Sequence, residues 1–471
     1  MTAGAGEADR AFVNSPQPSA VRRPGRAALW SAALLLAFSA PAASAVPRVK
    51  PDRGPGKPEK TPTPTPTPTP SPTPTPTPTP TTGVAATSAR AFTDSVCVAT
   101  HLHYSDTAYY SRWPEVRDAL VGSGIRHVRD GQLDSSVWSY PTVSARWKEW
   151  ADRGVRATLG PYPGDIARKV ALAAQNPAVE AIEGPNELDL TGTGWQTRLL
   201  DAQRAIWEAT RAQPNLAGRP VLVGSLAFSD RWSQVTTDLK PYFTDGNLHS
   251  YPGGQTPGSN LSTQFAASRT AFGAAPVRVT ETGYHNAVAA PTTEGHKPAS
   301  ERAGGIYVPQ LYLEYFRRGV KQSCMYELLD EWADPERNDR ESNFGLLRSD
   351  LSRKPAYTHL QRLLSLLGDP FPASAPSRLD YTVTGPSTLR HVLLQKGDGS
   401  FWLALWNDVS VWDPVARTDT YPADATASVS LGGSRAWSLY DVRGGTTAVR
   451  SGTGSSVSVG VPVSPLLLQV R

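Results

Sequence analysis

Eight short runs of β-branched and apolar residues alternate with helical stretches between residues 91 and 368, and this alternation constrains the fold more than any other feature. The predicted strands span 95–100, 125–129, 156–159, 179–183, 221–226, 247–249, 277–280 and 322–327. Eight strand–helix units in about 280 residues predict a closed parallel (β/α)8 barrel, the TIM barrel. A doubly wound open sheet is the alternative. It is disfavoured because no glycine-rich nucleotide-binding loop follows the first run.

The last hundred residues have a different pattern, with short strand candidates separated by Gly, Asp and Pro. The candidates span 391–396, 401–406, 427–431, 436–441, 455–460 and 466–470. Gly397, Asp398 and Gly399 stand where a hairpin turn is needed. The pattern predicts a small antiparallel β-sandwich over 370–471, packed against a barrel domain over 91–369. Its role, structural or carbohydrate-binding, stays open.

The N-terminus has the three parts of a secretory signal peptide. Arginines at positions 22–26 precede an apolar run at 27–38, which is too short to span a membrane, and small residues follow at 43–45. We therefore expect residues 1–45 to be removed, leaving a secreted, extracellular protein with no membrane anchor. An uncleaved anchor is the alternative.

Residues 61–80 consist only of Thr-Pro and Ser-Pro dipeptides. Proline at every second position favours an extended polyproline-type chain, which cannot form a core. The sequence therefore predicts a disordered linker over 46–90, either a bare spacer or a stalk that associates the protein with a cell wall.

Charge is balanced over the part that is predicted to fold. Residues 1–81 contain 9 of the 47 Lys and Arg and 4 of the 42 Asp and Glu, so 38 of each sign remain. A nucleic-acid-binding protein needs a basic surface to neutralise phosphates. We therefore expect no nucleic-acid partner.

Two carboxylates end two of the predicted barrel strands. The fourth strand runs into Gly184, Pro185, Asn186 and Glu187, and the seventh ends at Glu281. Active sites of these barrels lie at the carboxyl ends of the strands. Hydrolysis of a glycosidic bond needs two carboxyl groups that flank it. Glu187 and Glu281 are therefore the candidate catalytic residues.

These two motifs resemble those of the clan A glycoside hydrolases, and within that clan the bacterial cellulase-like and xylosidase-like families. The resemblance covers the barrel and the appended β-domain. It implies that Glu187, after Asn186, is the general acid/base and that Glu281 is the nucleophile of a retaining double displacement. It also implies a polysaccharide or oligosaccharide substrate.

Other residues at strand ends agree with this resemblance. Arg129 ends the second strand, where the clan places an arginine near the nucleophile, and Asn186 matches the asparagine that binds the sugar 2-hydroxyl. His249 and Tyr251 follow the sixth strand, where the clan carries side chains that contact the catalytic carboxylates. An arginine beside Glu281 would favour the charged form of that carboxylate.

The ends of the first and eighth strands contribute further substrate-binding candidates. His101 and His103 follow the first strand. No third ligand with matching spacing is present, which argues against a metal site at these two histidines, and neither a metal nor an organic cofactor is implied. The clan often ends its eighth strand with a tryptophan platform. This chain has Tyr326 there and Trp332 later, so either is a candidate substitute.

Two cysteines, Cys97 and Cys324, lie on the first and eighth strands, which become neighbours when a barrel closes. Adjacent strands are about 4.7–4.9 Å apart, near the short end of the range for a disulfide. A bridge and two buried free thiols both fit the sequence.

The sequence as a whole predicts a secreted, monomeric glycoside hydrolase that degrades a polysaccharide. Two alternatives stay open: a transglycosylase that remodels cell-wall glycan with the same residues, and a non-catalytic carbohydrate-binding wall protein. The latter is disfavoured because both carboxylates are present.

Overall fold

The computed structural model describes residues 83–291, 296–373 and 375–471. The predicted signal peptide and most of the predicted linker lie outside the described residues. No helix in these ranges is long and apolar enough to span a membrane.

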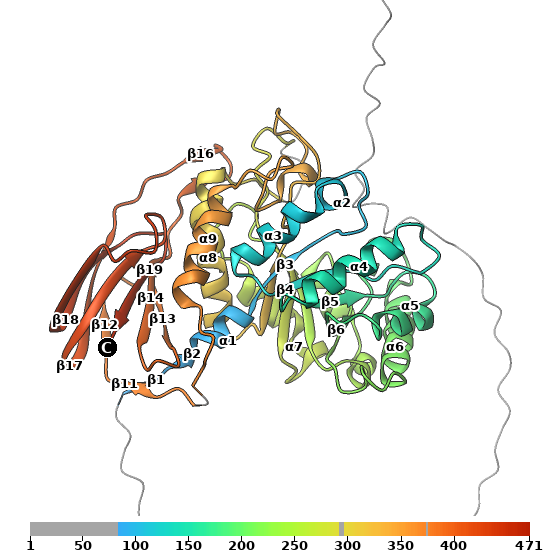
Figure 1. The fold of residues 1–471 in the computed structure, drawn as a ribbon, viewed down its shortest axis with the longest axis horizontal. Coiled ribbons are helices and arrows are strands. Elements are labelled where there is room, and N and C mark those ends of the chain that lie inside the picture. Colours follow the sequence, from blue (N-terminus) through green and yellow to red (C-terminus); the bar gives the residue numbers. More distant parts are fainter. Residues whose placement is uncertain (1–82, 292–295, 374) are drawn as a thin grey trace, which may run out of the picture.

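Eight parallel strands form one sheet at the centre of the molecule (Figure 1). Their order is β7-β6-β5-β4-β3-β10-β9-β8, and a parallel bridge between Leu222 and Asp245 joins the two ends of this series. The predicted TIM barrel is thereby confirmed. The strands are β3 (Val96–Ala99), β4 (His127–Gly131), β5 (Arg156–Gly160), β6 (Val179–Glu183), β7 (Val221–Leu222), β8 (Gly246–Ser250), β9 (Val277–Thr282) and β10 (Gln322–Met325).

Helices connect the barrel strands and cover the outside of the sheet. They are α1 (Ala89–Asp94), α2 (Ala108–Ser111), α3 (Trp113–Ser123), α4 (Tyr140–Ala151), α5 (Ile166–Ala173), α6 (Trp195–Arg211), α7 (Leu261–Phe272), α8 (Glu301–Arg317) and α9 (Pro355–Leu367). In α9, Leu360, Leu363, Leu364 and Leu367 are buried, the spacing of one helix face. This periodicity is the reason that the helix is recognisable from sequence.

The connection after β7 is not an α-helix. It consists of two 3-10 helices, η3 (Ser229–Gln234) and η4 (Thr237–Tyr242). Pro241 lies inside η4 and has no amide hydrogen to donate. The connection from β7 to β8 is therefore irregular.

The C-terminal part is antiparallel and β-rich, as predicted, but its main sheet is continuous. The long strands β17 and β18 pair along two stretches, with a register shift between Ser430 and Arg435. The sheet encloses a second apolar core. Its strands are β12 (Thr382–Thr384), β13 (Leu389–Gln395), β14 (Phe401–Asn407), β17 (Ala425–Asp441), β18 (Arg450–Val461) and β19 (Leu466–Val470).

Residues just before the barrel complete the β-domain. The short strand β1 (Val84–Ala85) pairs with β11 (Arg378–Leu379), and β2 (Thr87–Ser88) adds to the edge of β13. The predicted linker extended to residue 90, but these residues form strands and the start of α1. Their pairing partners are almost 300 positions away, so local composition did not reveal them. A further two-stranded sheet joins β15 (Trp412–Asp413) and β16 (Thr418–Asp419).

The β-domain packs against α8 and α9 of the barrel (Figure 1). Trp402, Trp406 and Leu467 are buried in the same apolar cluster as the barrel helices. The hydrogen bonds that cross this contact include those from Val411 N to the Tyr307 hydroxyl at 2.9 Å and from Trp412 Nε1 to the Pro298 carbonyl at 2.7 Å.

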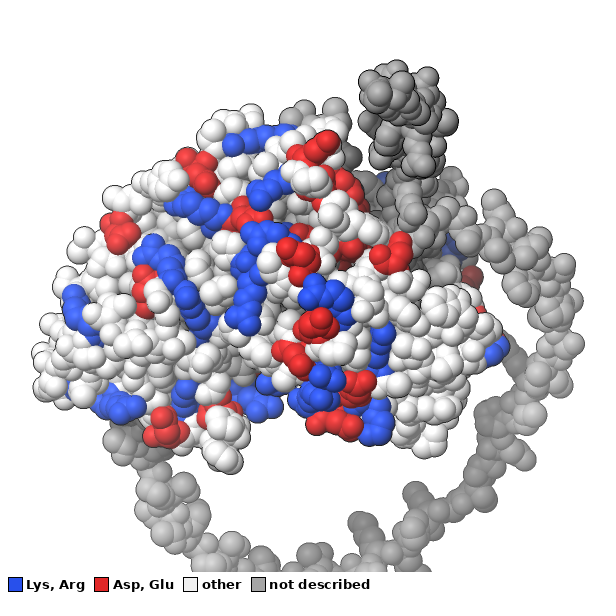
Figure 2. Space-filling model, turned by 45° about the horizontal axis from the view of Figure 1, so that its top comes forward, with Lys and Arg blue, Asp and Glu red and all other residues white. Residues whose placement is uncertain are grey.

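Cys97 and Cys324 form a disulfide between β3 and β10. The two residues are register partners of the parallel pair, and both are buried. The sequence left open a disulfide or two buried free thiols, and the structure has the disulfide. On the face that Figure 2 shows, basic and acidic side chains are interspersed.

Candidate functional site

The two candidate catalytic residues and the residues predicted to contact them come from the carboxyl ends of four barrel strands. Arg129 lies on β4, Glu187 follows β6, His249 lies on β8 and Glu281 on β9. Tyr251 is the first residue after β8. Because the carboxyl ends of parallel strands meet at one rim of a barrel, side chains far apart in the chain converge there.

Glu187 is held in a rare backbone conformation, with φ of 47° and ψ of 44°. The adjacent backbone explains how this is maintained. Glu187 N donates to the Ser225 carbonyl at 3.1 Å, and Ser225 N donates to the Pro185 carbonyl at 3.1 Å. A Cβ at Gly184 would clash with the Gln203 side chain and the Gly224 backbone. This close approach of the segments after β6 and β7 therefore requires glycine and positions the Glu187 carboxylate.

His249 lies between the two candidate catalytic carboxylates. Its Nδ1 is 2.7 Å from Glu187 Oε1 and 3.3 Å from Glu281 Oε2. One oxygen of Glu187 and one of Glu281 lie within 4.8 Å of each other. The two acidic groups, 94 positions apart, thus face the same small space.

Glu281 is surrounded by hydrogen-bond donors. Arg129 Nη1 donates to its Oε1 at 2.6 Å, and the Tyr251 hydroxyl donates to its Oε2 at 2.8 Å. Burial alone would raise the pKa of this carboxyl group, but His249, Arg129 and the two hydrogen bonds outweigh burial and lower it. Burial likewise acts to lower the pKa of His249, and the charges of Glu281 and Glu187 raise it above its usual value.

A second carboxylate, Glu183 at the end of β6, orients Arg129. Arg129 Nε donates to Glu183 Oε2 at 2.8 Å, and Arg129 Nη2 donates to Asn186 Oδ1 at 2.7 Å. Glu183 also accepts from Asn247 Nδ2 at 2.9 Å and from the Thr280 hydroxyl at 2.8 Å. Because these groups are buried and mutually hydrogen-bonded, the guanidinium plane has little freedom. Sequence analysis assigned no role to Glu183, Asn247 or Thr280, although each also lies on a strand that ends at the site.

A cavity of about 590 Å³ opens above these residues. Most of the predicted site residues line it, namely Arg129, Asn186, Glu187, His249, Tyr251, Glu281, His101 and Tyr326. His103 and Trp332 are not among its lining residues. His103 packs edge-on against Tyr104, which does line the cavity, and Trp332 stacks on Tyr104 with ring centroids 6.5 Å apart. Both therefore contact a cavity-lining residue without lining the cavity themselves.

The structure adds lining residues that the sequence did not single out for this role. They come mainly from loops and include Leu190, Phe228, His296, Arg340, Glu341 and Phe344. Leu190 and Phe228 are each 48% exposed. Loop residues like these have no strand or helix pattern that places them at the cavity, so local sequence provides no signal for them.

A buried lysine, Lys354, joins the segments that follow β9 and β10. Lys354 Nζ donates to Asp330 Oδ1 at 2.8 Å, to Asn286 Oδ1 at 3.1 Å and to the Asn343 carbonyl at 3.2 Å. Lys354 is only 2% exposed. The segments after β9 and β10 are thereby joined beside the cavity.

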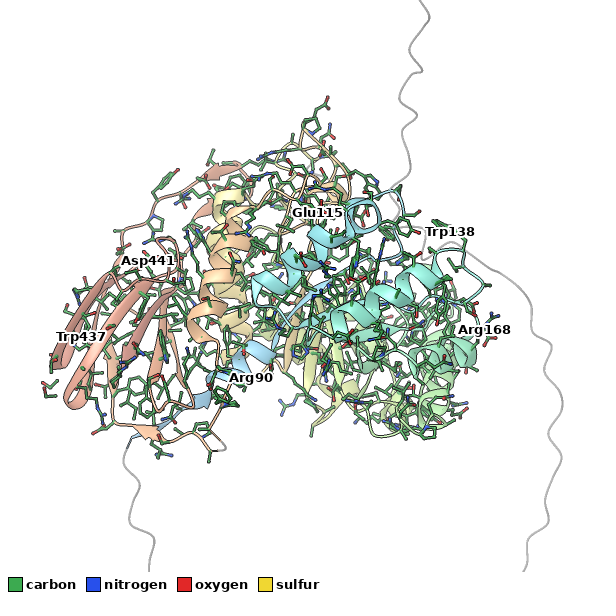
Figure 3. The ribbon with its side chains drawn as sticks, in the orientation of Figure 1. Arg90, Glu115, Trp138, Arg168, Trp437 and Asp441 are labelled. Carbon is green, nitrogen blue, oxygen red and sulfur yellow. A yellow bond between two sulfur atoms is a disulfide. The ribbon has the colours of Figure 1, made fainter. Side chains whose placement is uncertain are left out.

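The other aromatic residues of the loops mostly lie elsewhere. Trp195, Trp232 and Tyr284 are buried in the apolar core. Trp138 is 70% exposed and projects from the outer edge of the barrel, outside the cavity lining (Figure 3). Tyr104 and Tyr162, in contrast, line the cavity together with Tyr251 and Tyr326 and are placed to contact a ligand.

The comparison with known proteins identifies the fold. No family model and no curated protein matches the chain. Among solved structures, a family 39 glycoside hydrolase from the gut symbiont Bacteroides cellulosilyticus WH2 matches with a TM-score of 0.54 and 13% identity, over 81% of this chain and 82% of that one. The family 39 enzyme from Xanthomonas axonopodis pv. citri also matches with a TM-score of 0.54 and 13% identity, over 83% of this chain and 96% of that one.

These matches cover both the barrel and the β-domain. They agree with the resemblance that the motifs around Glu187 and Glu281 indicated, at the level of the fold. The chain therefore has a (β/α)8 barrel with an appended β-domain, a fold similar to that of these two family 39 structures.

Proposed function

We propose that this protein is a secreted retaining glycoside hydrolase, with Glu281 as nucleophile and Glu187 as general acid/base. One observation carries the proposal: these two carboxylates meet across His249 in a cavity at the carboxyl end of the barrel. Retaining enzymes place their two carboxyl groups about 5–5.5 Å apart, whereas inverting enzymes leave about 6.5–9.5 Å for a water molecule. Oxygens within 4.8 Å of each other favour retention.

The surroundings of the two carboxylates suit these different roles. Glu281, with a lowered pKa and donors on both oxygens, is the group kept ionised for attack on the anomeric carbon. As Glu281 forms a bond to that carbon, the bond to the leaving oxygen breaks and protonated Glu187 gives its proton to that oxygen. The ionised Glu187 then takes a proton from water, whose oxygen attacks the same carbon and releases Glu281.

Secretion is supported by two independent features. The N-terminus has the parts of a signal peptide, and Cys97 and Cys324 form a bridge of the kind that persists in oxidising compartments. We infer that the protein acts outside the cell on a glycan, as a monomer.

A screen of the purified protein against plant and wall glycans tests the proposal, with Glu281→Gln as the inactive control. Release of sugar by the wild type and not by the variant supports it, and NMR of the first product gives the anomeric configuration. A product of inverted configuration would contradict the retaining assignment. A transglycosylase with the same residues would instead transfer sugar to added acceptor, which product analysis at high acceptor concentration detects.

Replacing Glu187 by glutamine is expected to slow the cleavage of glycosides with poor leaving groups most. A glycoside with a nitrophenol-type leaving group needs little protonation, whereas an alkyl or sugar leaving group needs a proton from Glu187. We expect the formation of the glycosyl–enzyme to slow about 10²–10³-fold for the latter and much less for the former. The measurement is kcat/KM for both classes of glycoside of the sugar found in the screen. Equal losses would argue against Glu187 as the acid.

Replacing Arg129 by methionine is expected to move the acid limb of the pH profile upward. The positive charge of Arg129 helps to lower the pKa of Glu281, and attack requires the ionised form. Without that charge the pKa rises, so activity is lost at a higher pH as the solution is acidified, by about one pH unit or more. The test is kcat/KM against pH. Arg129→Lys retains the charge and should move the limb less; an unmoved limb in the methionine variant would contradict the assignment.

The leaving group is expected to contact an apolar surface beside Glu187. Leu190 N donates to the Glu187 carbonyl at 3.1 Å, and the Asp189 carboxylate accepts from Phe228 N at 3.1 Å. Leu190 and Phe228 thus border the cavity next to the proposed acid. Phe228→Ala should raise KM about tenfold with less effect on kcat. The matched control is Trp138→Ala, an exposed aromatic outside the cavity, which should change neither constant.

A further inference from the structure

A second cluster of one histidine and two carboxylates adjoins the cavity and shares no residue with the cluster of Glu187, His249 and Glu281. His101 follows β3, and Glu327 and Glu331 follow β10. His101 Nε2 is 3.5 Å from Glu327 Oε2 and 4.0 Å from Glu331 Oε1. One possible ligand atom from each of the three residues lies within 4.8 Å of the others. The two segments that supply these residues are more than 220 positions apart in the chain.

Glu327 is buried, and only one of its two carboxylate oxygens has a hydrogen-bond partner. Its side chain has 0% exposure. Its Oε2 accepts a hydrogen bond from the Tyr109 hydroxyl at 3.3 Å, whereas its Oε1 has no hydrogen-bond partner. Within the described part of the chain, no lysine or arginine forms an ion pair with Glu327. A buried carboxylate in this position must be protonated or must face a cation, because an isolated buried charge is very costly.

His101 completes a set of donors that suits a metal ion. Its Nε2 is buried and has no hydrogen-bond partner, and it points toward the carboxylates. Neutral imidazole is a preferred ligand of zinc and similar ions, whereas calcium and magnesium favour oxygen alone. Zinc binds nitrogen and oxygen ligands at about 2.0–2.2 Å, which places neighbouring ligands about 3.4 Å apart in a tetrahedral site. The 3.5 Å and 4.0 Å separations need only a small contraction.

We propose that His101, Glu327 and Glu331 bind a divalent transition-metal ion such as Zn²⁺, with the remaining coordination position open to water. The ion would join the segment after β3 to the segment after β10. Each of these segments also supplies cavity-lining residues, Tyr104 and Tyr326 respectively. The ion would hold these two parts of the cavity wall together, and its binding does not require the proposed glycosidase activity.

The catalytic cluster of Glu187, His249 and Glu281 is a less suitable site for such an ion. Both oxygens of Glu281 already accept hydrogen bonds, from Arg129 and Tyr251. The guanidinium of Arg129 also places a fixed positive charge within 2.6 Å of one of them. A cation there would have to displace these donors, whereas Glu327 offers an oxygen with no partner.

The test is zinc binding by the mature protein, expressed without a histidine tag and freed of metal with EDTA. Titration calorimetry measures affinity, and elemental analysis after dialysis measures stoichiometry. We expect the wild type to bind one Zn²⁺ per chain and to gain a few degrees of Tm with saturating zinc. We expect Glu327→Gln and Glu331→Gln each to weaken binding at least tenfold, and CaCl₂ not to displace the zinc.

Glu187→Gln is the matched control, because it alters the other histidine–carboxylate cluster. Zinc binding that persists in Glu187→Gln and is lost in Glu327→Gln supports the proposal. Three results would overturn it: no stoichiometric zinc in the wild type, undiminished binding in both Glu327→Gln and Glu331→Gln, or loss of binding in Glu187→Gln alone. Circular dichroism checks folding, and if Glu327→Gln does not fold, Glu331→Gln decides.

Discussion

Glu281→Gln is expected to lower kcat/KM by about 10⁴-fold or more while the protein stays folded. The amide has nearly the same shape as the carboxylate, so it can still fill the space beside Arg129 and Tyr251. It cannot form a covalent bond to the anomeric carbon, and the stepwise route through a glycosyl–enzyme is then closed. The measurement is the rate of hydrolysis of the glycan found in the screen, alongside circular dichroism and Tm.

Glu208→Gln is a suitable control, because Glu208 is an exposed residue of α6 that is far from the cavity lining. It should leave the rate unchanged. Chemical rescue makes the test sharper. In Glu281→Ala, added azide can take the place of the missing carboxylate, and the glycosyl azide should have the configuration opposite to that of the substrate. Hydrolysis retained by Glu281→Gln at near wild-type rate would exclude Glu281 as the nucleophile.

Breaking the bridge between Cys97 and Cys324 is expected to cost about 3–5 kcal/mol in the free energy of unfolding. The two residues are separated by 227 positions, so the bridge closes a long loop in the unfolded chain and removes much of its conformational entropy. Denaturant unfolding of the Cys97→Ala/Cys324→Ala variant measures the effect. The folded variant should retain activity, because the bridge lies below the rim, between strands that are also hydrogen-bonded.

The two single variants separate loss of the bridge from loss of packing. Either substitution alone breaks the same bridge, so each should lose nearly as much stability as the double variant. Losses that simply add would point to cavities left by two independent buried side chains. A total loss below about 1 kcal/mol would mean that the bridge contributes little to this fold.

Much of the barrel follows from local pattern. The strand predicted at 179–183 has the same bounds as β6, and the strand predicted at 156–159 ends one residue before β5 does. Strands buried on both faces are apolar runs, and helices repeat their apolar positions every three or four residues, so both leave a local signal. Residues 84–88 left none, because β1 and β2 are short and their partners lie in the β-domain.

The site residues, too, fall into those that the local sequence revealed and those that it did not. Polar residues that directly end a strand were recognisable, and Arg129, Glu187, His249 and Glu281 do converge. Their catalytic roles remain predictions. Trp332 was a candidate substitute for the clan's tryptophan after the eighth strand, and it stacks on Tyr104 without lining the cavity itself. The cavity's loop residues were missed, since the path of a loop depends on contacts with distant segments and not on its own periodicity.

The sequence by itself determined the eight-unit barrel, the β-rich C-terminal part and the two strand ends that carry Glu187 and Glu281. Only the tertiary structure decided which other side chains meet: Glu183 on Arg129, and Glu327 beside His101. The physical reason is the range of the interactions. Secondary structure follows the chemistry of neighbouring residues, whereas buried charges find partners across the barrel, where closure brings distant strands together.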